Sequence, residues 1–340
     1  MKMRLLIFPL LILIIPSLWK SKSEIPTLKD NESVGKLLYQ LGDDPGWYPV
    51  KTLKKSTAAI GKDLFHTGFA QAGKGKGKKG KKQSKHFVCT SCHNIQREDK
   101  DLKVSDPQER LDYTMAAGIP FLQGTTMYGA VSRRTFYNGD YSLKYGDLVD
   151  AARNDLRGAI QLCAVECAQG RELKTWELES ILKYLWTIDL KVKDLQLTNQ
   201  EKVNLEAQMS QNPKAAIATI QSRYLTGSPA TFVKSDEERK SYDRQANDIN
   251  NGENIYLNSC MHCHENGRYS FFELDTSKVT MKYLQQKATK YTDHSIYQAV
   301  RYGIYSTSGR KSYMPQYPIE KMSEKQLGDL RGYIDYMADR

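Results

Sequence analysis

Apolar residues along this chain recur at the three- and four-residue spacing that places them on one face of an α-helix. The pattern is clearest in two segments, whose apolar faces would be formed by Leu178, Ile181, Leu182 and Leu185 and by Leu327, Leu330, Ile334 and Met337. The alternation of apolar and polar residues that marks a β-strand is weak throughout. The pattern therefore predicts a mainly α fold.

Polar residues add start signals for several helices. A Ser or Thr followed three residues later by Glu or Gln forms a capping box, and the chain has such pairs at Thr198–Glu201, Ser235–Glu238 and Ser323–Gln326. Two further helices are expected, one over residues 58–65 and one that contains Ile255, Tyr256 and Leu257. We expect residues 96–125 to be surface helix and loop.

Two pentapeptides, residues 89–93 and 260–264, share the form Cys-x-x-Cys-His. Two cysteines at this spacing can form thioethers with one porphyrin, and the histidine then lies beneath the iron as an axial ligand. A zinc site would need four ligands close together, and neither pair lies in the βαβ pattern of thioredoxin-like redox proteins. The sequence therefore predicts two covalently bound haem c groups, attached through Cys89, Cys92, Cys260 and Cys263, with His93 and His264 as iron ligands.

The chain has 340 residues, of which 40% are hydrophobic, and this is enough for two domains. We expect a first haem domain over residues 26–195, a helical linker over 196–240 and a second haem domain over 241–340. Both haem domains should be helical.

Positive charge is concentrated in one segment. Lys and Arg exceed Asp and Glu by 11, and residues 73–85 alone contain seven lysines among glycines. Such a segment cannot bury apolar surface, so we expect a disordered insertion. It is either a solvated loop or a docking arm for an acidic redox partner or an anionic membrane. No aromatic residues interleave these lysines, so nucleic acid is not an expected partner.

Residues 1–25 read as a signal peptide or an N-terminal anchor. A basic start precedes an apolar run from Leu5 to Trp19, which is typical of an export signal and short for a membrane span. The small-residue cleavage site is poor, so an uncleaved membrane anchor is the alternative. Either interpretation places the folded part outside the cytoplasm, in the periplasm.

The second haem domain resembles class I cytochrome c over nearly its whole length. The helix into the second motif, the Met314–Pro315 pair and the closing helix carry the resemblance. It implies that His264 is the proximal ligand and Met314 the distal ligand. Met314 also follows a polar loop, residues 306–310, and Pro315 would stiffen it. Methionine ligation favours Fe(II), so the second haem should have the higher potential.

The distal ligand of the first haem has several candidates. Met127 is one, and Met115 is another that lies in an apparent helix. The third is Cys163, which Cys167 follows at a spacing of about 6 Å on a helix, within reach of a disulfide. We therefore keep Cys163, Met127 and a Cys163–Cys167 disulfide as open interpretations.

The segment around Cys163 resembles the first haem domain of the thiosulfate dehydrogenases and of the dihaem cytochrome subunit of the thiosulfate-oxidising system. In those families an iron-binding Cys precedes a Gly by seven positions, a Leu follows, and a helix closes the domain. Cys163, Gly170 and Leu173 hold these places here. Cys167 replaces a usual Ser, and the insertion at 73–82 has no counterpart, so the resemblance bears more on ligation than on substrate.

Three functions follow from these features. The first is a dihaem electron carrier in which electrons pass from a lower-potential first haem to the second. The second is an enzyme of the thiosulfate dehydrogenase type, in which Arg133, Arg134 or Arg171 would hold a sulfur anion near the first haem. The third is a dihaem peroxidase, which the segments 61–65 and 89–94 resemble although the downstream sequence does not. We rank the carrier first, and the sequence names no catalytic residue.

Overall fold

The computed structural model describes residues 28–48, 50–53, 56–70, 81–290, 292, 294–304 and 314–340. The expected leader, residues 73–80 of the lysine-rich segment and the loop 306–310 lie outside the described residues.

The described residues form helices and turns, and among them there is no strand longer than the isolated bridges Ser33–Lys191 and Ile304–Met314. The mainly α prediction is confirmed. The α-helices are α1 Val34–Gln40, α2 Ala58–Thr67, α3 Pro107–Ala116, α4 Tyr141–Tyr145, α5 Leu156–Leu162, α6 Thr175–Thr187, α7 Asn199–Gln211, α8 Pro213–Gln221, α9 Ser235–Lys240, α10 Ile249–Ile255, α11 Met261–His264, α12 Lys278–Ala288, α13 Ile296–Tyr302 and α14 Glu324–Asp339. Short π-helical turns at Cys163–Cys167 and Tyr256–Cys260 continue α5 and α10.

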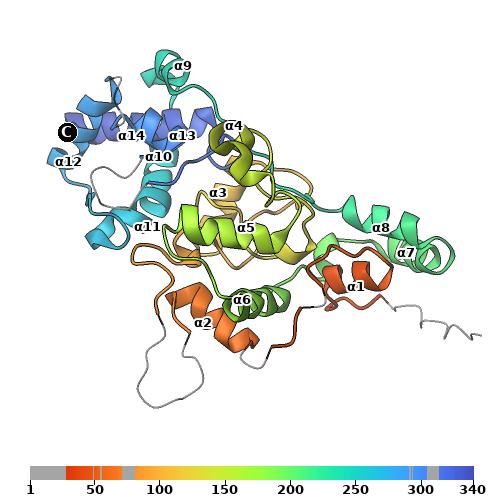
Figure 1. The fold of residues 1–340 in the computed structure, drawn as a ribbon. Coiled ribbons are helices and arrows are strands. Elements are labelled where there is room, and N and C mark those ends of the chain that lie inside the picture. The colour runs from red at the N-terminus through yellow and green to blue at the C-terminus, as the bar shows by residue number, and fades with distance from the viewer. Residues whose placement is uncertain are drawn as a thin grey trace, which may run out of the picture.

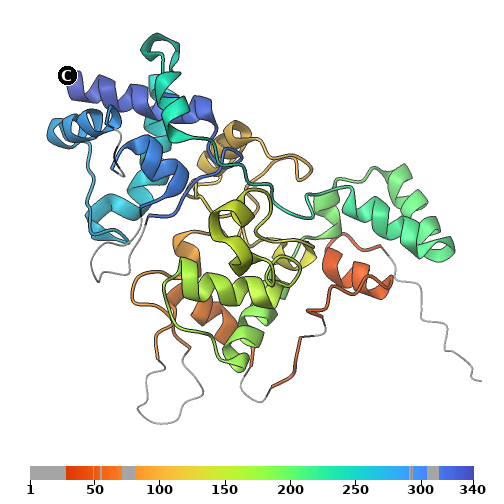
Figure 2. The same cartoon turned by 45° about the horizontal axis from the view of Figure 1, so that its top comes forward.

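The helices gather in three groups (Figures 1 and 2). Helices α10 to α14 lie together at one side, α2, α5 and α6 lie in the middle, and α1 packs with α7 and α8 at the other side. Three buried apolar clusters correspond to these groups. The apolar faces expected from the sequence point into them, since Ile181 and Leu185 of α6 and Leu327 and Ile334 of α14 are all at most 1% exposed.

Helices α2 and α6 cross at a glycine. A Cβ on Gly61 would lie 1.8 Å from the carbonyl oxygen of Ser180 and 2.9 Å from the Cβ of Tyr184, so only glycine fits. Four residues after the glycine, Phe65 packs on the ring of Tyr184 with centroids 5.5 Å apart.

The same crossing recurs between α10 and α14. A Cβ on Gly252 would lie 2.0 Å from the carbonyl oxygen of Asp329 and 2.8 Å from the Cβ of Tyr333. Again an aromatic residue four positions after the glycine, Tyr256, packs on that tyrosine with centroids 5.6 Å apart. The residue offsets are identical, so the two halves repeat one helix pair, and in each half a Cys-x-x-Cys-His motif follows the first helix of the pair.

The segment 96–125 is not the surface element that the sequence predicts. Leu111 of α3 and Phe121 are fully buried in the cluster formed by α10 to α14, and the Phe121 amide donates to the carbonyl of Asn258 at 2.9 Å. Leu111, Met115 and Phe121 of this polar segment pack against the group formed by α10 to α14, which the helical pattern alone did not reveal. The segment therefore ties the two halves together.

Two of the three predicted capping boxes are confirmed, at Thr198 and at Ser323. The third is wrong. Helix α9 has Lys234 at its N-cap without a side-chain cap. The Glu238 side chain pairs instead with the buried Arg301 at 2.6 Å, because α9 packs on α13.

Candidate functional site

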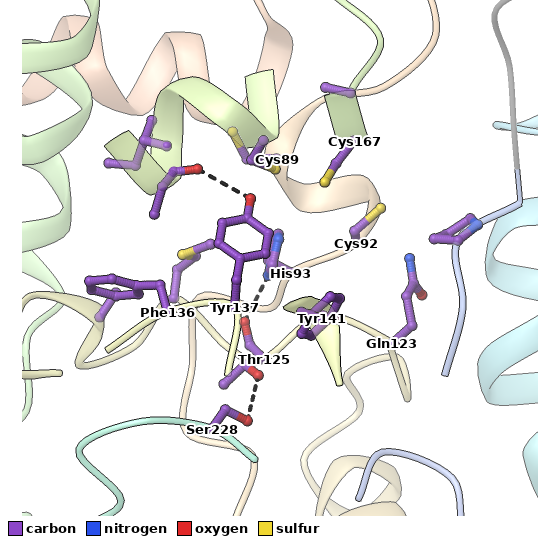
Figure 3. Close-up of a pocket in the computed structure, with 18 of the residues that line it drawn as sticks. Cys89, Cys92, His93, Gln123, Thr125, Phe136, Tyr137, Tyr141, Cys167 and Ser228 are labelled. Atoms are coloured by element: carbon purple, nitrogen blue, oxygen red, sulfur yellow. Dashed lines mark hydrogen bonds between the residues drawn. The ribbon is translucent and has the colours of Figure 1, made fainter. Parts of the chain in front are cut away.

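The first motif opens into a cavity with about 1480 Å³ of empty space, its mouth included. Cys89, Cys92 and His93 line one part of its wall, and α5 with the following π-helical turn lines another. Figure 3 shows Cys89, Cys92 and Cys167 around this cavity, with Tyr137 projecting toward its middle. The wall is largely apolar, as expected for a pocket that holds a large flat ligand.

His93 is oriented for iron through one ring nitrogen. Its Nδ1 lies 2.7 Å from the carbonyl oxygen of Thr125 (Figure 3), which leaves Nε2 available to a metal. The chain passes so close here that a Cβ on Gly124 would lie 2.6 Å from the His93 Nδ1. Burial lowers the pKa of His93, which favours the neutral imidazole that binds metal.

The second motif repeats this arrangement. Cys260, Cys263 and His264 line a cavity with about 1770 Å³ of empty space, its mouth included. The Nδ1 of His264 lies 2.6 Å from the carbonyl oxygen of Phe272, and burial lowers the pKa of His264. Both histidines therefore keep Nε2 for a ligand in the cavity.

Met314 lines the second cavity with the second motif, as the predicted ligation requires. Its backbone amide and carbonyl pair with Ile304 at 3.0 and 3.1 Å. Gly303 has φ of 73°, and a Cβ there would lie 2.1 Å from the Met314 carbonyl oxygen. Both ends of the intervening loop are thus held together next to the cavity.

The cysteines of both motifs are half-buried thiols. Burial raises the pKa of Cys89 and of Cys260 to about 12 and that of Cys263 to about 11. A redox-active Cys-x-x-Cys pair has a lowered thiol pKa instead. The thiols therefore lack the pKa of a redox-active pair, and in the described part of the chain no group of three or more His, Cys, Asp or Glu side chains could hold a metal ion by itself.

Two of the three candidates for the first distal position, Cys163 and Met127, line the first cavity, and Cys167 lines it as well. Met115 does not, since it packs against the cluster of the second half. The structure has no disulfide between Cys163 and Cys167. A hydrogen bond with Cys167, together with burial, raises the pKa of Cys163.

The two cavities are neighbours, which the sequence did not indicate. Phe87, Gln123 and Pro315 line both of them. The ring of His262, within the second motif, lies near the backbone of Ser91, within the first. Burial lowers the pKa of His262 to about 4, so a neutral histidine lies where the two motifs meet.

The three arginines named from the sequence lie in different places. Arg133 lines the first cavity, whereas Arg134 pairs with Asp43 and Arg171 pairs with Glu177 at 2.6 Å. Lys321, which sequence reasoning missed, also lines the first cavity although it comes from the second half of the chain. Burial lowers the pKa of Lys321 to about 8.

Tyr137 is a second residue that the sequence did not single out. Its φ of 51° is unusual for a bulky residue and places its side chain in the first cavity. Its hydroxyl donates to the Ala159 carbonyl at 3.3 Å, and Cys167 is a further hydrogen-bond partner. No local sequence signal marks a tyrosine for a positive φ.

Residues 247–334 match the family described as cytochrome c oxidase, cbb3-type, subunit III. The match contains the second motif and Met314. It supports a c-type cytochrome with covalently bound haem c and haem-based electron transfer. No curated protein and no solved structure matched the chain. Among the described residues, no helix is both long and apolar enough to cross a membrane.

Proposed function

We propose that this chain is a dihaem c-type cytochrome that carries electrons from a lower-potential first haem to a His/Met-ligated second haem. The observation that carries the proposal is the duplication of the whole arrangement. The helices cross at Gly61 in the same way as they cross at Gly252. The Nδ1 of His93 lies next to a backbone carbonyl, as the Nδ1 of His264 does.

The duplication matters because the family match covers one half alone. In that half a histidine with its Nδ1 held by a carbonyl, two half-buried cysteines and an apolar cavity belong to a cytochrome c domain. The first half has the same three features around Cys89, Cys92 and His93. When bound, the haems supply one-electron chemistry at iron, and the residues fix the iron ligands and exclude water.

For the first haem, Cys163 suits the distal position better than Met127. The Met127 amide donates at 2.8 Å to the carbonyl of Asn94, the residue after His93, and Thr125 holds the His93 ring. Met127 thus belongs to the loop on the histidine side. Cys163 approaches from a separate element, the π-helical turn after α5. Cysteine ligation lowers the potential and methionine ligation raises it, which sets the direction of transfer.

The lining residues that the two cavities share support direct transfer of electrons between the haems. The side chains of Phe87 and Gln123 and the ring of Pro315 form a wall common to both cavities. The redox partners would be exported or membrane-bound proteins in the periplasm, and the lysine-rich segment would favour an acidic one.

A redox titration followed by optical absorption tests the proposal. We expect two well-separated potentials, and in Cys163→Ala the lower potential alone should change, together with the spectrum of that haem. The matched variant Met127→Leu should leave both potentials in place. Equal potentials in the native protein would contradict the direction of transfer.

A second function, oxidation of a sulfur anion such as thiosulfate at the first haem, has one specific observation in its favour. Cys163 and Arg133 line the same cavity, so a thiolate-ligated haem and a cation for the anion would be neighbours. Turnover of thiosulfate with an artificial electron acceptor would establish this enzyme, whereas absence of turnover leaves the carrier.

A further inference from the structure

The two cavities differ in their charged residues. The first is lined by two cations, Arg133 and Lys321, and by no Asp or Glu among the described residues. The described wall of the second cavity has neither Asp and Glu nor Lys and Arg. Two positively charged side chains in an otherwise apolar cavity indicate that the cavity binds an anionic group.

Arg133 has no carboxylate partner among the described residues, and Lys321 shares its carboxylate partner with Arg110. The side chain of Arg133 donates to the Tyr128 carbonyl at 3.3 Å, and no described carboxylate lies within ion-pair distance of it. The Nζ of Lys321 is 4.0 Å from a carboxylate oxygen of Glu98. That carboxylate is already bonded by Arg110 at 3.0 Å and by the Thr126 amide at 2.7 Å.

Asp189 also lies near Arg133, but the hydroxyls of Ser33 and Ser132 already donate to its carboxylate. The remaining acid near this pair is Asp99. Burial raises the pKa of its carboxyl, which weakens its role as a counter-ion. Buried cations without full compensation are costly, so the cavity favours a ligand that brings negative charge to Arg133 and Lys321.

We propose that Arg133 and Lys321 bind the two carboxylate side groups of the haem in the first cavity. This inference rests on the proposed function, since it requires that the first motif carries haem. Each cation forms a charge-assisted hydrogen bond with one carboxylate. Lys321 precedes α14 of the second half, so the second half of the chain helps to hold the first haem.

The same pair of cations could instead bind a free oxyanion from solution, such as thiosulfate. Haem carboxylates and a free oxyanion both present negatively charged oxygens to the two cations, and they differ in when they are present. The haem carboxylates are present whenever haem is attached, whereas a free anion acts only when it is added.

The experiment compares Arg133→Gln and Lys321→Gln with the charge-preserving Arg133→Lys and Lys321→Arg. Arg134→Gln is the control, because Arg134 is the sequence neighbour and pairs with Asp43 away from the cavity. Mass spectrometry first establishes that each variant carries two haems. Redox titration and the resonance Raman band of the haem carboxylates are then measured in a buffer without small oxyanions.

We expect the potential of the first haem to fall in both Gln variants, because removal of a nearby positive charge favours Fe(III). The Raman band should shift in the same variants. The second haem, the charge-preserving variants and Arg134→Gln should stay near the native values. If Lys321→Gln does not fold, the Arg133 variants alone test the inference.

Native potentials and Raman bands in both Gln variants would overturn the inference. A first-haem potential that responds to added thiosulfate in the native protein, and to neither substitution without it, would assign the pair to a free anion and overturn it as well. A native protein with one haem would refute the proposed function itself, which is a separate result.

Discussion

The crossing of α10 and α14 makes a quantitative prediction for Gly252→Ala. The new Cβ would lie 2.0 Å from the Asp329 carbonyl oxygen, 2.6 Å from its carbonyl carbon and 2.8 Å from the Tyr333 Cβ. Two of these atoms belong to the backbone, so no side-chain rotation relieves the overlap. The helices must separate.

Separation of the helices opens the apolar cluster between them. Overpacking of a well-packed core lowers the free energy of unfolding by about 1–3 kcal/mol and occasionally more. Alanine in place of glycine in a helix raises it by ~1 kcal/mol. Because the obstruction is backbone, we expect the cost at the upper end, and a net loss of about 2 kcal/mol in the free energy of unfolding. Gly61→Ala should lose a similar amount, since its Cβ would lie 1.8 Å from the Ser180 carbonyl oxygen.

Urea unfolding of the haem-loaded protein, followed by far-UV circular dichroism, measures this loss. Gly328→Ala, in the same helix α14, is the matched control. A Cβ there would meet the Oδ1 of Asn247 at 2.5 Å, an atom at the end of a side chain that can turn away. If Gly252→Ala is as stable as Gly328→Ala, the close crossing and the duplication built on it are refuted.

Three further predictions concern the sites. Met314→Leu should convert the second haem to a high-spin optical spectrum and lower its potential, and an unchanged spectrum would exclude Met314 as ligand. Glu98→Gln should lower the free energy of unfolding, measured in urea, by about 3–5 kcal/mol, because it leaves the buried Arg110 without its counter-charge. A decrease below about 1 kcal/mol would contradict this. Burial raises the pKa of Glu98, but Arg110 and Lys321 outweigh it and hold the pKa below the usual 4.5. The stability that Glu98 contributes is therefore present above pH 4.5 and is lost as pH falls through the lowered pKa, so acid unfolding of Glu98→Gln should be less steep.

Local patterns predicted the helices well. The spacing of Ile181 and Leu185, and of Leu327 and Ile334, determines which helix face is buried, and this needs no knowledge of the partner helix. The Cys-x-x-Cys-His motifs predict their own chemistry, and the structure adds the carbonyl that orients each histidine.

Contacts between distant segments could not be predicted in the same way. Lys321 reaches the first cavity because the second half packs on the segment around Phe121, and neither residue signals this locally. The sequence predicts a capping box with Glu238, but the Glu238 carboxylate pairs with Arg301 instead. The shared wall at Gln123 likewise depends on how the halves dock.

Mass spectrometry of the mature protein, made in a host competent for cytochrome maturation, tests the central claim most directly. We predict the added mass of two haems per chain, with one haem on the peptide containing residues 89–93 and one on the peptide containing residues 260–264. Haem on the second peptide alone would contradict the account of a dihaem cytochrome.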